Sequence, residues 1–414
     1  GMIDENSDVA AIRCLAAGYL KPALVSSSNY ARALVGKVTG NNALFHGESV
    51  VIADDESYVQ EENRGYIGIL NPTTDEVAKY TDCGWKGKAG SGIKRLTIEN
   101  MTGINALYNI SGFEFCANAA DSSKTWVAMT DGEPQLRIFA DVAQTVDLYP
   151  HIGWYAYAAE GVGASEENPY KISTIDQLKA LVYFVNQGDS FEGKYIQLDA
   201  ANNELVFNTD APSTLSEWEA YIKESAPAKL APIGTSETPF KGQFDGNGCT
   251  IKGLYVEPGS SQAAGFFGVT GETATIKNLT ITNSYIQGTS SDGTGSIVGR
   301  GGGTFEAIYS DAIVVNTSAK GEAGTGGIVG ATDEIVITNC WYAGKLTATQ
   351  NGNAYAGGML GFVGNGEITI SHCLNTGEIK SLADKTKGPR VGGIIGSVDG
   401  ADKTKAVITD CFNA

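Results

Sequence analysis

Gly327-Ile-Val-Gly330, followed by Ile335-Val-Ile-Thr-Asn-Cys340, is a unit that returns along the C-terminal third of this 414-residue chain. Its glycine-bracketed part has relatives at residues 265–268, 296–299, 358–361 and 393–396. The closing glycines are residues 268, 299, 330, 361 and 396, so they lie 31, 31, 31 and 35 residues apart. A period of this size, with insertions confined to the stretches between motifs, is typical of a solenoid.

The second run of each unit alternates apolar and polar residues, which predicts a strand with one buried face. We align the runs at residues 279–284, 335–340, 368–373 and 406–411. This alignment gives two aliphatic columns, in one of which Ile281 matches Ile337, and a column of small residues: Ser284, Ala312, Cys340, Cys373 and Cys411. A bulky column follows it: Tyr285, Ile313, Trp341, Leu374 and Phe412. We therefore interpret the three cysteines as small buried side chains.

A single unit of this kind is too small to fold alone. Burying three or four aliphatic side chains returns roughly 6–10 kcal/mol, whereas ordering about 31 residues costs roughly 1–2 kcal/mol each in backbone entropy. Stacked units share hydrogen bonds and bury both faces of each rung. The paired glycines suit corners that need a positive φ or a close passage of two backbones. Because parallel crossovers are nearly always right-handed, the sequence predicts an all-β, right-handed parallel β-helix.

These repeats resemble the GLUG motif of bacterial surface proteins, which is named for its Gly-Leu-any-Gly pattern. The upstream segments Asn168-Pro-Tyr-Lys-Ile-Ser-Thr174 and Pro239-Phe-Lys-Gly-Gln-Phe-Asp-Gly-Asn-Gly248 resemble the lead-in of such proteins, so the likeness covers residues 160–414. The chain departs from the pattern at Cys249, where relatives often have histidine, and by an insertion between Leu198 and Leu230. The resemblance implies a secreted or surface-attached β-helix, common in gut bacteria and associated with cell adhesion, without a known ligand.

Four segments follow from these patterns. Residues 1–155 carry no repeat and many short candidate strands, one of them at residues 106–115, which predicts a β-sandwich; they are faintly similar to fimbrillin-type modules. Residues 156–168 are a linker. Residues 169–264 hold a helix that begins at the capping box Thr174/Gln177 and covers the end of the β-helix, the first coils, and a helical insertion. The GLUG-type repeats occupy residues 265–414.

Composition excludes several classes of partner. The formal net charge is −18 and the pI is about 4.6, which argues against nucleic acid or an anionic membrane as the partner. No apolar run approaches the length of a membrane helix, so we expect no membrane insertion. Gly1-Met2 resembles a cloning scar. The resemblance to GLUG-type surface proteins implies an extracellular or outer-surface location, with a signal or anchor already removed.

Catalytic and metal motifs are weak. Asn208-Thr-Asp210 matches a short motif of polygalacturonase-like β-helix enzymes but precedes the repeats, and no paired aspartates follow. Immunoglobulin-A-specific metallopeptidases also carry such repeats, but their HExxH motif does not occur here. Asp245-Gly-Asn-Gly248 has calcium-like spacing, yet it is also a strong turn signal, and Gly299-Arg-Gly-Gly-Gly303 favours a flexible corner. We expect no catalytic residue, no metal, no cofactor and no enzyme.

Aromatic side chains are the remaining candidates for ligand binding, since flat rings suit sugars. Tyr342 is expected to point outward beside Trp341 in the bulky column, and Trp218 and Tyr221 share one face of the inserted helix. The first hypothesis is a non-catalytic surface adhesin that binds a host protein or glycan. The alternatives are a glycan-capturing or carbohydrate-active β-helix and a structural spacer. Oligomeric state, and a disulfide among Cys14, Cys83 and Cys116, stay open.

Overall fold

A computed structural model of the chain divides it into two compact units, Gly1–Gly153 and Trp154–Ala414. The residues that the structure describes are 2–3, 9–11, 15–17, 37–38, 43–45, 50–52, 84–86, 94–95, 102–109, 115–116, 125–131, 134–156, 158–225, 227–258, 262–318, 324–349, 354–382, 388–399 and 404–414.

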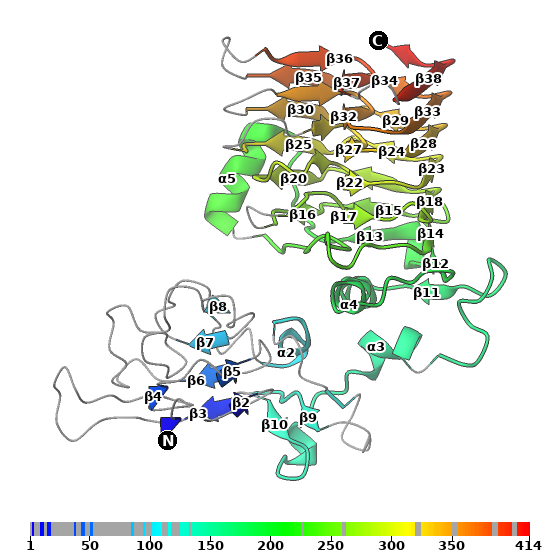
Figure 1. Cartoon of the computed structure of the whole chain (residues 1–414). Coiled ribbons are helices and arrows are strands. Elements are labelled where there is room, and N and C mark those ends of the chain that lie inside the picture. Colours follow the sequence, from blue (N-terminus) through cyan, green and yellow to red (C-terminus); the bar gives the residue numbers. More distant parts are fainter. Residues whose placement is uncertain are drawn as a thin grey trace. The chain divides into compact units, whose positions relative to one another are not determined.

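The second unit is a parallel β-solenoid with its coils stacked one on another (Figure 1). Its longest sheet, the eight-stranded sheet, consists of β11 (Tyr170–Ile172), β12 (Tyr195–Leu198), β14 (Gln243–Asp245), β18 (Thr275–Lys277), β23 (Thr304–Glu306), β28 (Ile335–Thr338), β33 (Glu367–Ser371) and β38 (Lys405–Thr409). The seven-stranded sheet consists of β13 (Glu204–Val206), β15 (Thr250–Lys252), β19 (Thr280–Thr282), β24 (Tyr309–Ser310), β29 (Trp341–Tyr342), β34 (Leu374–Asn375) and β39 (Phe412–Asn413).

Three further sheets complete the coils. The β16 sheet consists of β16 (Tyr255–Val256), β20 (Tyr285–Gly288), β25 (Ile313–Asn316), β30 (Lys345–Ala348) and β35 (Glu378–Ser381). The β17 sheet consists of β17 (Phe267–Thr270), β22 (Val298–Gly301), β27 (Val329–Thr332), β32 (Leu360–Val363) and β37 (Ile395–Val398). The β21 sheet consists of β21 (Thr294–Gly295), β26 (Gly324–Gly326), β31 (Tyr355–Gly357) and β36 (Arg390–Gly392).

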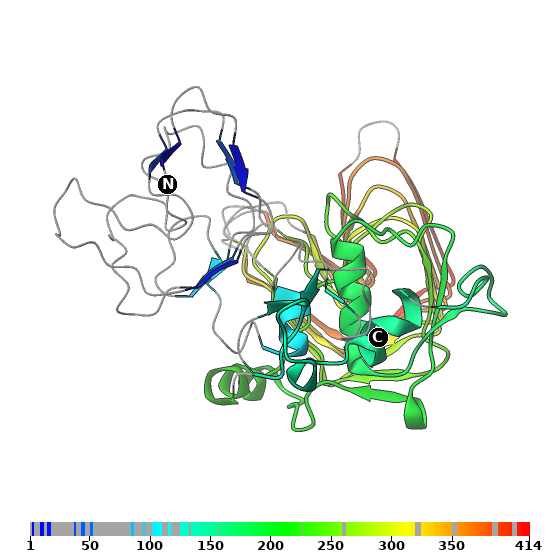
Figure 2. The same cartoon turned by 90° about the horizontal axis from the view of Figure 1, so that it is seen from below.

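From β20 onward the chain visits the five sheets once in each coil, so that β20 to β24 make one turn and β25 begins the next above β20. Seen along the stack, the coils lie over one another (Figure 2). Val298 is in register with Val329, Leu360 and Ile395, which are 31, 31 and 35 residues further on in turn. The solenoid predicted from the glycine spacing is confirmed.

Stacked apolar columns form the core. Ile276, Phe305, Ile337 and Ile370 lie in register on successive strands of the eight-stranded sheet, and all four are fully buried. The middle residues of the first four glycine motifs are also fully buried, among them Ile328, whereas Ile394 and Ile395 of the last motif are partly buried. Each coil therefore contributes apolar side chains to one continuous core, which is what stabilises units that cannot fold alone.

The strand register corrects the predicted alignment of the early repeats. We matched Ile281 with Ile337, but Ile337 is in register with Phe305 and Ile276, whereas Ile281 lies in the seven-stranded sheet. The physical reason is that β18 and β19 carry nearly the same tetrapeptide, Thr-Ile-Lys-Asn and Thr-Ile-Thr-Asn. Each ends in an asparagine with left-handed φ, so both strands meet the same kind of corner.

The predicted column of small residues therefore separates into two. Ser284 and Ala312 precede paired strands of the β16 sheet. Cys340 instead follows Ile308 in its column, because the Trp341 N–H donates to the Ile308 carbonyl at 2.8 Å. Ile308 and Cys340 are both buried, so the interpretation of the cysteines as buried side chains holds for Cys340 and Cys373.

The repeated glycines allow close packing of backbones. A Cβ atom on Gly327 would lie 2.1 Å from the Gly358 carbonyl oxygen, and one on Gly358 would lie 2.1 Å from the Gly393 oxygen. Real Cβ contacts are never so short, so glycine is required at the same place in successive coils. None of these three has a positive φ. Of the two reasons expected for the glycines, the close passage of backbones applies here.

Helix α4 (Ile175–Asn186) covers the first coils of the solenoid, as predicted (Figure 1). The Thr174 hydroxyl accepts from the Gln177 N–H at 3.2 Å, and the Gln177 side-chain oxygen accepts from the Ser173 N–H at 2.7 Å, which completes the capping box. The buried face of the helix belongs to the same apolar cluster as the coils and consists of Leu178, Leu181, Val182 and Val185.

The insertion before the repeats contains the second predicted helix, α5 (Leu215–Ser225), with Thr214 and Glu217 at its capping box. The short 3-10 helix η3 (Ala201–Asn203) lies before β13. The coils are built in β-strands throughout, and the helices stand at one end and at the side, as Figure 1 shows.

In the first unit, the described strands are short. Two parallel pairs are formed, one by β1 (Met2–Ile3) and β4 (Lys37–Val38) and the other by β2 (Val9–Ala11) and β5 (Ala43–Phe45). A four-stranded parallel sheet consists of β3 (Leu15–Ala17), β6 (Val50–Ile52), β7 (Gly84–Lys86) and β8 (Lys94–Arg95). The pair β9 (Trp126–Val127) and β10 (Gln135–Leu136) is antiparallel. A sandwich is built from antiparallel pairs, so the parallel pairs do not support the predicted β-sandwich. Most of residues 1–100 lie outside the described part, and for them the sandwich stays a prediction.

Helices occupy part of the region in which only strands were predicted. Helix α2 (Ile104–Asn109) overlaps the first four residues of the strand predicted at residues 106–115, which corrects that assignment. The alternation of apolar residues there does not distinguish a short helix from a strand. The unit also contains η2 (Val142–Gln144), and helix α3 (Tyr149–Ala156) follows at the boundary between the units.

Candidate functional site

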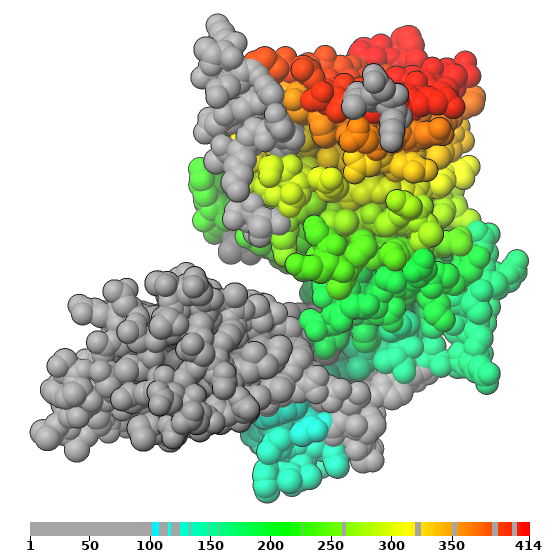
Figure 3. Space-filling view, in the orientation of Figure 1, coloured from blue at the N-terminus to red at the C-terminus, as the bar shows by residue number. Residues whose placement is uncertain are grey.

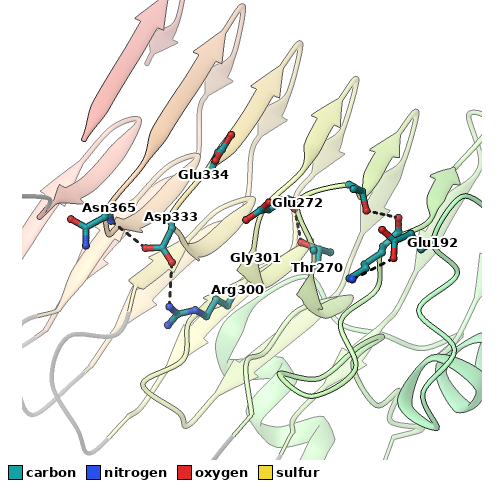
Figure 4. Close-up of a pocket in the computed structure, with 12 residues that line it drawn as sticks. Glu192, Thr270, Glu272, Arg300, Gly301, Asp333, Glu334 and Asn365 are labelled. Atoms are coloured by element: carbon teal, nitrogen blue, oxygen red, sulfur yellow. Dashed lines mark hydrogen bonds and ion pairs between the residues drawn. The ribbon is translucent and has the colours of Figure 1, made fainter. Parts of the chain in front are cut away.

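A groove follows one corner of the solenoid, where each strand of the β17 sheet ends and the next strand of the eight-stranded sheet begins. We call it the corner groove. Its volume is about 630 Å³, and its lining residues are Glu192, Lys241, Thr270, Gly271, Glu272, Thr273, Arg300, Gly301, Gly302, Asp333, Glu334 and Asn365. Figure 4 shows that the labelled side chains come from successive coils.

Equivalent corners of four coils form most of the groove. They are the segments between β17 and β18, β22 and β23, β27 and β28, and β32 and β33. Lys241 and Glu192 come from the two corners that precede them in the stack. Neighbouring coils lie about 4.8 Å apart, so four corners extend over about 14 Å along the stack. In the space-filling view the coils appear as successive colour bands (Figure 3). Because the lining residues come from several coils, the groove runs along the stack of coils rather than within one of them. An extended ligand fits this direction better than a compact one.

Glycine keeps the middle of the groove open. Gly302 lies between Glu272 and Glu334 of the neighbouring coils, because a Cβ atom on Gly302 would be 2.8 Å from the Glu334 carbonyl oxygen and 3.5 Å from the Glu272 Cα. Gly301 has a φ of 146° and Gly303 one of 113°, which only glycine adopts readily. Two exposed carboxylates therefore flank a stretch of bare backbone.

Two ion pairs cross the groove (Figure 4). The Lys241 ammonium lies 3.4 Å from the Glu192 carboxylate, and the Arg300 guanidinium lies 3.6 Å from the Asp333 carboxylate. The Asp333 carboxylate also accepts from the Asn365 N–H at 3.2 Å. Ion pairs this exposed contribute little to stability. They do hold the long side chains in place along the floor of the groove.

The groove carries a negative net charge. Its four carboxylates, on Glu192, Glu272, Asp333 and Glu334, outnumber the two cations of Lys241 and Arg300, which leaves −2 at neutral pH. None of the lining residues is aromatic, a histidine or a cysteine. The lining can therefore accept and donate hydrogen bonds, but it offers no ring to stack on and no histidine or cysteine side chain.

Two of the predicted ligand-binding aromatics are oriented opposite to expectation. Tyr342 is fully buried, and its hydroxyl donates to the Ala312 carbonyl at 3.1 Å. Trp341 is 42% exposed, and its indole N–H donates to the Thr376 hydroxyl at 2.9 Å. The expected outward position of Tyr342 is therefore wrong. The misaligned repeat is the cause, because β29 belongs to the seven-stranded sheet, in which Tyr342 faces the core.

Trp218 and Tyr221 attach helix α5 to the coils. Trp218 is fully buried and packs with Tyr255 and Tyr285, at ring-centroid distances of 6.1 and 5.7 Å. Tyr221 lies against Trp218 at 5.6 Å. Burial raises the pKa of Tyr285 to about 12, with further contributions from the nearby carboxylates of Glu219 and Glu257. These rings pack in an apolar cluster, and the Trp218 face is already occupied.

A smaller cavity of about 190 Å³ lies beside this helix. Trp218, Asp311 and Lys345 are among the residues that line it. Burial raises the pKa of Asp311, while a hydrogen bond from the Asn283 N–H acts in the opposite direction. The structure thus brings Trp218 to a cavity but does not bring the four predicted aromatics together at one site.

The corner groove was not predicted as a binding site from the sequence, although one segment that lines the groove was identified. The run at residues 299–303, predicted to be a flexible corner, forms part of its floor. The other lining residues come from corners of different coils and share no motif. The turn predicted at residues 245–248 is confirmed: the Asp245 carboxylate accepts from the Asn247 N–H at 2.8 Å, and Asn247 has a φ of 52°.

No family model matches the chain. It is 32% identical over 145 residues to halomucin of Haloquadratum walsbyi, covering 35% of this chain and 2% of halomucin. It is 29% identical over 126 residues to a candidate Gly-rich membrane protein of Evansella cellulosilytica, covering 30% of this chain and 12% of that protein. The chain thus spans a small part of these relatives.

One solved structure is similar, that of a candidate immunoglobulin A1 protease from Bacteroides ovatus. It matches with 20% sequence identity and a TM-score of 0.40, over 61% of this chain and 77% of that one. Among the helices of the described residues, none is long and apolar enough to cross a membrane. The same residues contain no group of three or more histidine, cysteine or acidic side chains placed to hold a metal ion.

Proposed function

We propose that this chain is a non-catalytic, extracellular or cell-surface binding protein of a bacterium, and that its corner groove binds an extended, neutral polar chain, namely a glycan. The observation that carries this proposal is the groove itself, in which polar side chains from successive coils line one channel about 14 Å long. A single coil offers only a few of these groups, so the stacking of coils creates the site.

The charge of the groove supports a neutral ligand. Glu272 and Glu334 flank the bare backbone at Gly302, and carboxylates of this kind accept hydrogen bonds from pairs of hydroxyl groups. The net charge of −2 in the groove and of −18 over the chain would repel an anionic polymer. Because the lining contains no aromatic ring, we expect modest affinity, which surface proteins commonly increase through many copies.

The surface location and the non-catalytic role rest on separate support. One relative is described as a membrane protein and the other bears the name halomucin, and the resemblance of the repeats to the GLUG motif points in the same direction. The groove lacks histidine and cysteine side chains, and no catalytic motif is found in the sequence. A spacer that only projects the first unit is the alternative if no ligand binds.

A glycan array with host matrix proteins spotted alongside tests the proposal. Wild-type protein is compared with Glu272→Trp, which fills the groove from an exposed position, and with Glu204→Trp, an exposed residue of β13 in another sheet. We expect wild type and the Glu204 variant to bind the same neutral glycans and the Glu272 variant to lose them at least tenfold. Binding only to host proteins, equal binding by all three, or no binding at all would reject the groove as a glycan site.

A further inference from the structure

Three cysteines form a ladder at one corner of the last coils. Cys340, Cys373 and Cys411 follow β28, β33 and β38, whose residues are paired in register. The Leu374 N–H donates to the Cys340 carbonyl and the Phe412 N–H to the Cys373 carbonyl, both at 2.9 Å. The three residues therefore occupy the same place in three successive coils.

Their side chains share one orientation. Each Sγ lies 3.2 Å from the carbonyl oxygen two residues earlier, which belongs to Thr338, Ser371 or Thr409. Cys340 and Cys373 are also each within 3.7 Å of a carbonyl in the coil before. The thiols thus point into the same corner of the core, one above the other, and each neighbours the next.

The spacing of this ladder suits a covalent bond. Adjacent parallel strands lie about 4.8 Å apart, and disulfides join Cα atoms that are about 4.4–6.8 Å apart. A disulfide can therefore join two of these cysteines in adjacent coils without movement of the backbone. Cys249 stands in the same column, but Leu279 and Ile308 separate it from Cys340, which puts it three strand spacings away and out of reach.

Cys373 is the member that both others touch. Hydrogen bonding with Cys340, and to a smaller extent with Cys411, lowers the pKa of Cys373 to about 7 against the effect of burial, whereas burial raises the pKa of Cys411. Cys411 is the most exposed of the three in this chain, whereas Cys340 and Cys373 are 1% and 2% exposed. A reagent from solvent therefore meets Cys411 first, and a good attacking thiolate lies behind it.

We propose that the ladder is a thiol–disulfide exchange site that accepts a small organic disulfide at Cys411 and ends as a Cys373–Cys411 disulfide, which links the last two coils. The Cys411 thiolate attacks one sulfur of the small disulfide, breaks its S–S bond and releases one small thiolate. The Cys373 thiolate then attacks Cys411 Sγ and releases the second. The two protein thiols lose two electrons and two protons, and the small disulfide gains them as two thiols.

The bond has a structural consequence. It joins β33 to β38, and with them β34 to β39, through a covalent link inside the core. Because Cys373 can make one bond only, Cys340 stays a thiol. The exchange site thus couples the redox state of the surroundings to the attachment of one coil.

The test treats the full chain with oxidised glutathione at pH 8 and then maps its cysteines by mass spectrometry after alkylation. We expect a Cys373–Cys411 link, with Cys340 alkylated, and an increase in thermal midpoint that a reductant reverses. Cys340→Ser should form the same link. Cys373→Ser should stop at glutathione on Cys411, and Cys411→Ser should take up no glutathione at Cys373.

Three results for the oxidised wild-type protein would overturn the proposal. In the mass-spectrometric map, Cys373 would remain alkylated, Cys373 would be linked to Cys340, or glutathione would persist on Cys411. A glutathione adduct at Cys373 in the Cys411→Ser protein would show that Cys411 is not the point of entry. Cys249 serves as an internal control because it is buried in the same column and should remain a thiol.

Discussion

The indole ring of Trp218 lies over the phenol ring of Tyr285, with ring centroids 5.7 Å apart and planes inclined by 23°. Trp218 comes from the inserted helix α5 and Tyr285 from strand β20 of the solenoid wall. The insertion is therefore held to the coils by a stacked aromatic pair rather than hanging from the first coil.

Removal of this ring should destabilise the solenoid. Trp218→Ala empties a fully buried site, for which we expect a loss of about 3–5 kcal/mol in the free energy of unfolding, measured by urea denaturation. Trp341→Ala is the matched control, because that indole is 42% exposed and its loss should cost much less. Equal costs for the two variants would contradict the assignment of Trp218 as the residue that attaches α5.

The stacked glycines predict a steric effect. Gly327→Ala would place a methyl group 2.1 Å from the Gly358 carbonyl, in backbone that cannot yield without moving the next coil. We expect a cost of about 1–3 kcal/mol or more by chemical denaturation. In Gly271→Ala the new methyl group meets only the flexible Lys241 side chain, so this variant should unfold almost as wild type does. A harmless Gly327→Ala would show that the coils are not packed this closely.

Alkaline pH should lower the free energy of unfolding because the pKa of Tyr285 differs between the folded and unfolded states. Its pKa is raised to about 12, above the value of about 10 expected in the unfolded chain. Between these values the unfolded state loses the proton and the folded state keeps it, so stability is fully present below pH 10 and falls as the pH rises toward 12. Urea midpoints measured from pH 9 to 12 should fall less steeply for Tyr285→Phe. A slope in Tyr285→Phe identical to that of wild type would refute the effect.

The buried position of Tyr342 gives a further test. Tyr342→Phe keeps the ring but removes the hydroxyl that donates to the Ala312 carbonyl, which should cost about 1–3 kcal/mol because the acceptor is buried. Tyr309→Phe, at a half-buried ring in the same sheet, should cost less. If Tyr342 pointed outward, as the sequence suggested, its substitution would be neutral.

Much of the fold follows from the sequence because the solenoid repeats one local pattern. The glycine spacing predicts the period, and the capping boxes at Thr174 and Thr214 predict both helices of the second unit. The strand register was partly wrong because β18 and β19 are almost identical in sequence. Only the hydrogen bonds between coils decide which of the two belongs to the same sheet as β28.

The candidate site could not be predicted in the same way. Glu272, Gly302 and Glu334 come together because the corners of three coils stack, and no two of them belong to one motif. Pattern recognition instead selected aromatic side chains, and of these Trp218 and Tyr342 serve the core. A site formed by residues of different coils can be recognised only when the strand register between the coils is known.

The measurement that tests the central claim most directly is a hydrogen–deuterium exchange footprint of the full chain with and without a glycan that it binds on the array. The account predicts slower exchange in peptides that cover the corners at residues 270–273, 300–303 and 333–334, with Glu272→Trp abolishing the change. Protection confined to any other face of the solenoid, or retained in Glu272→Trp, would contradict the corner groove as the binding site.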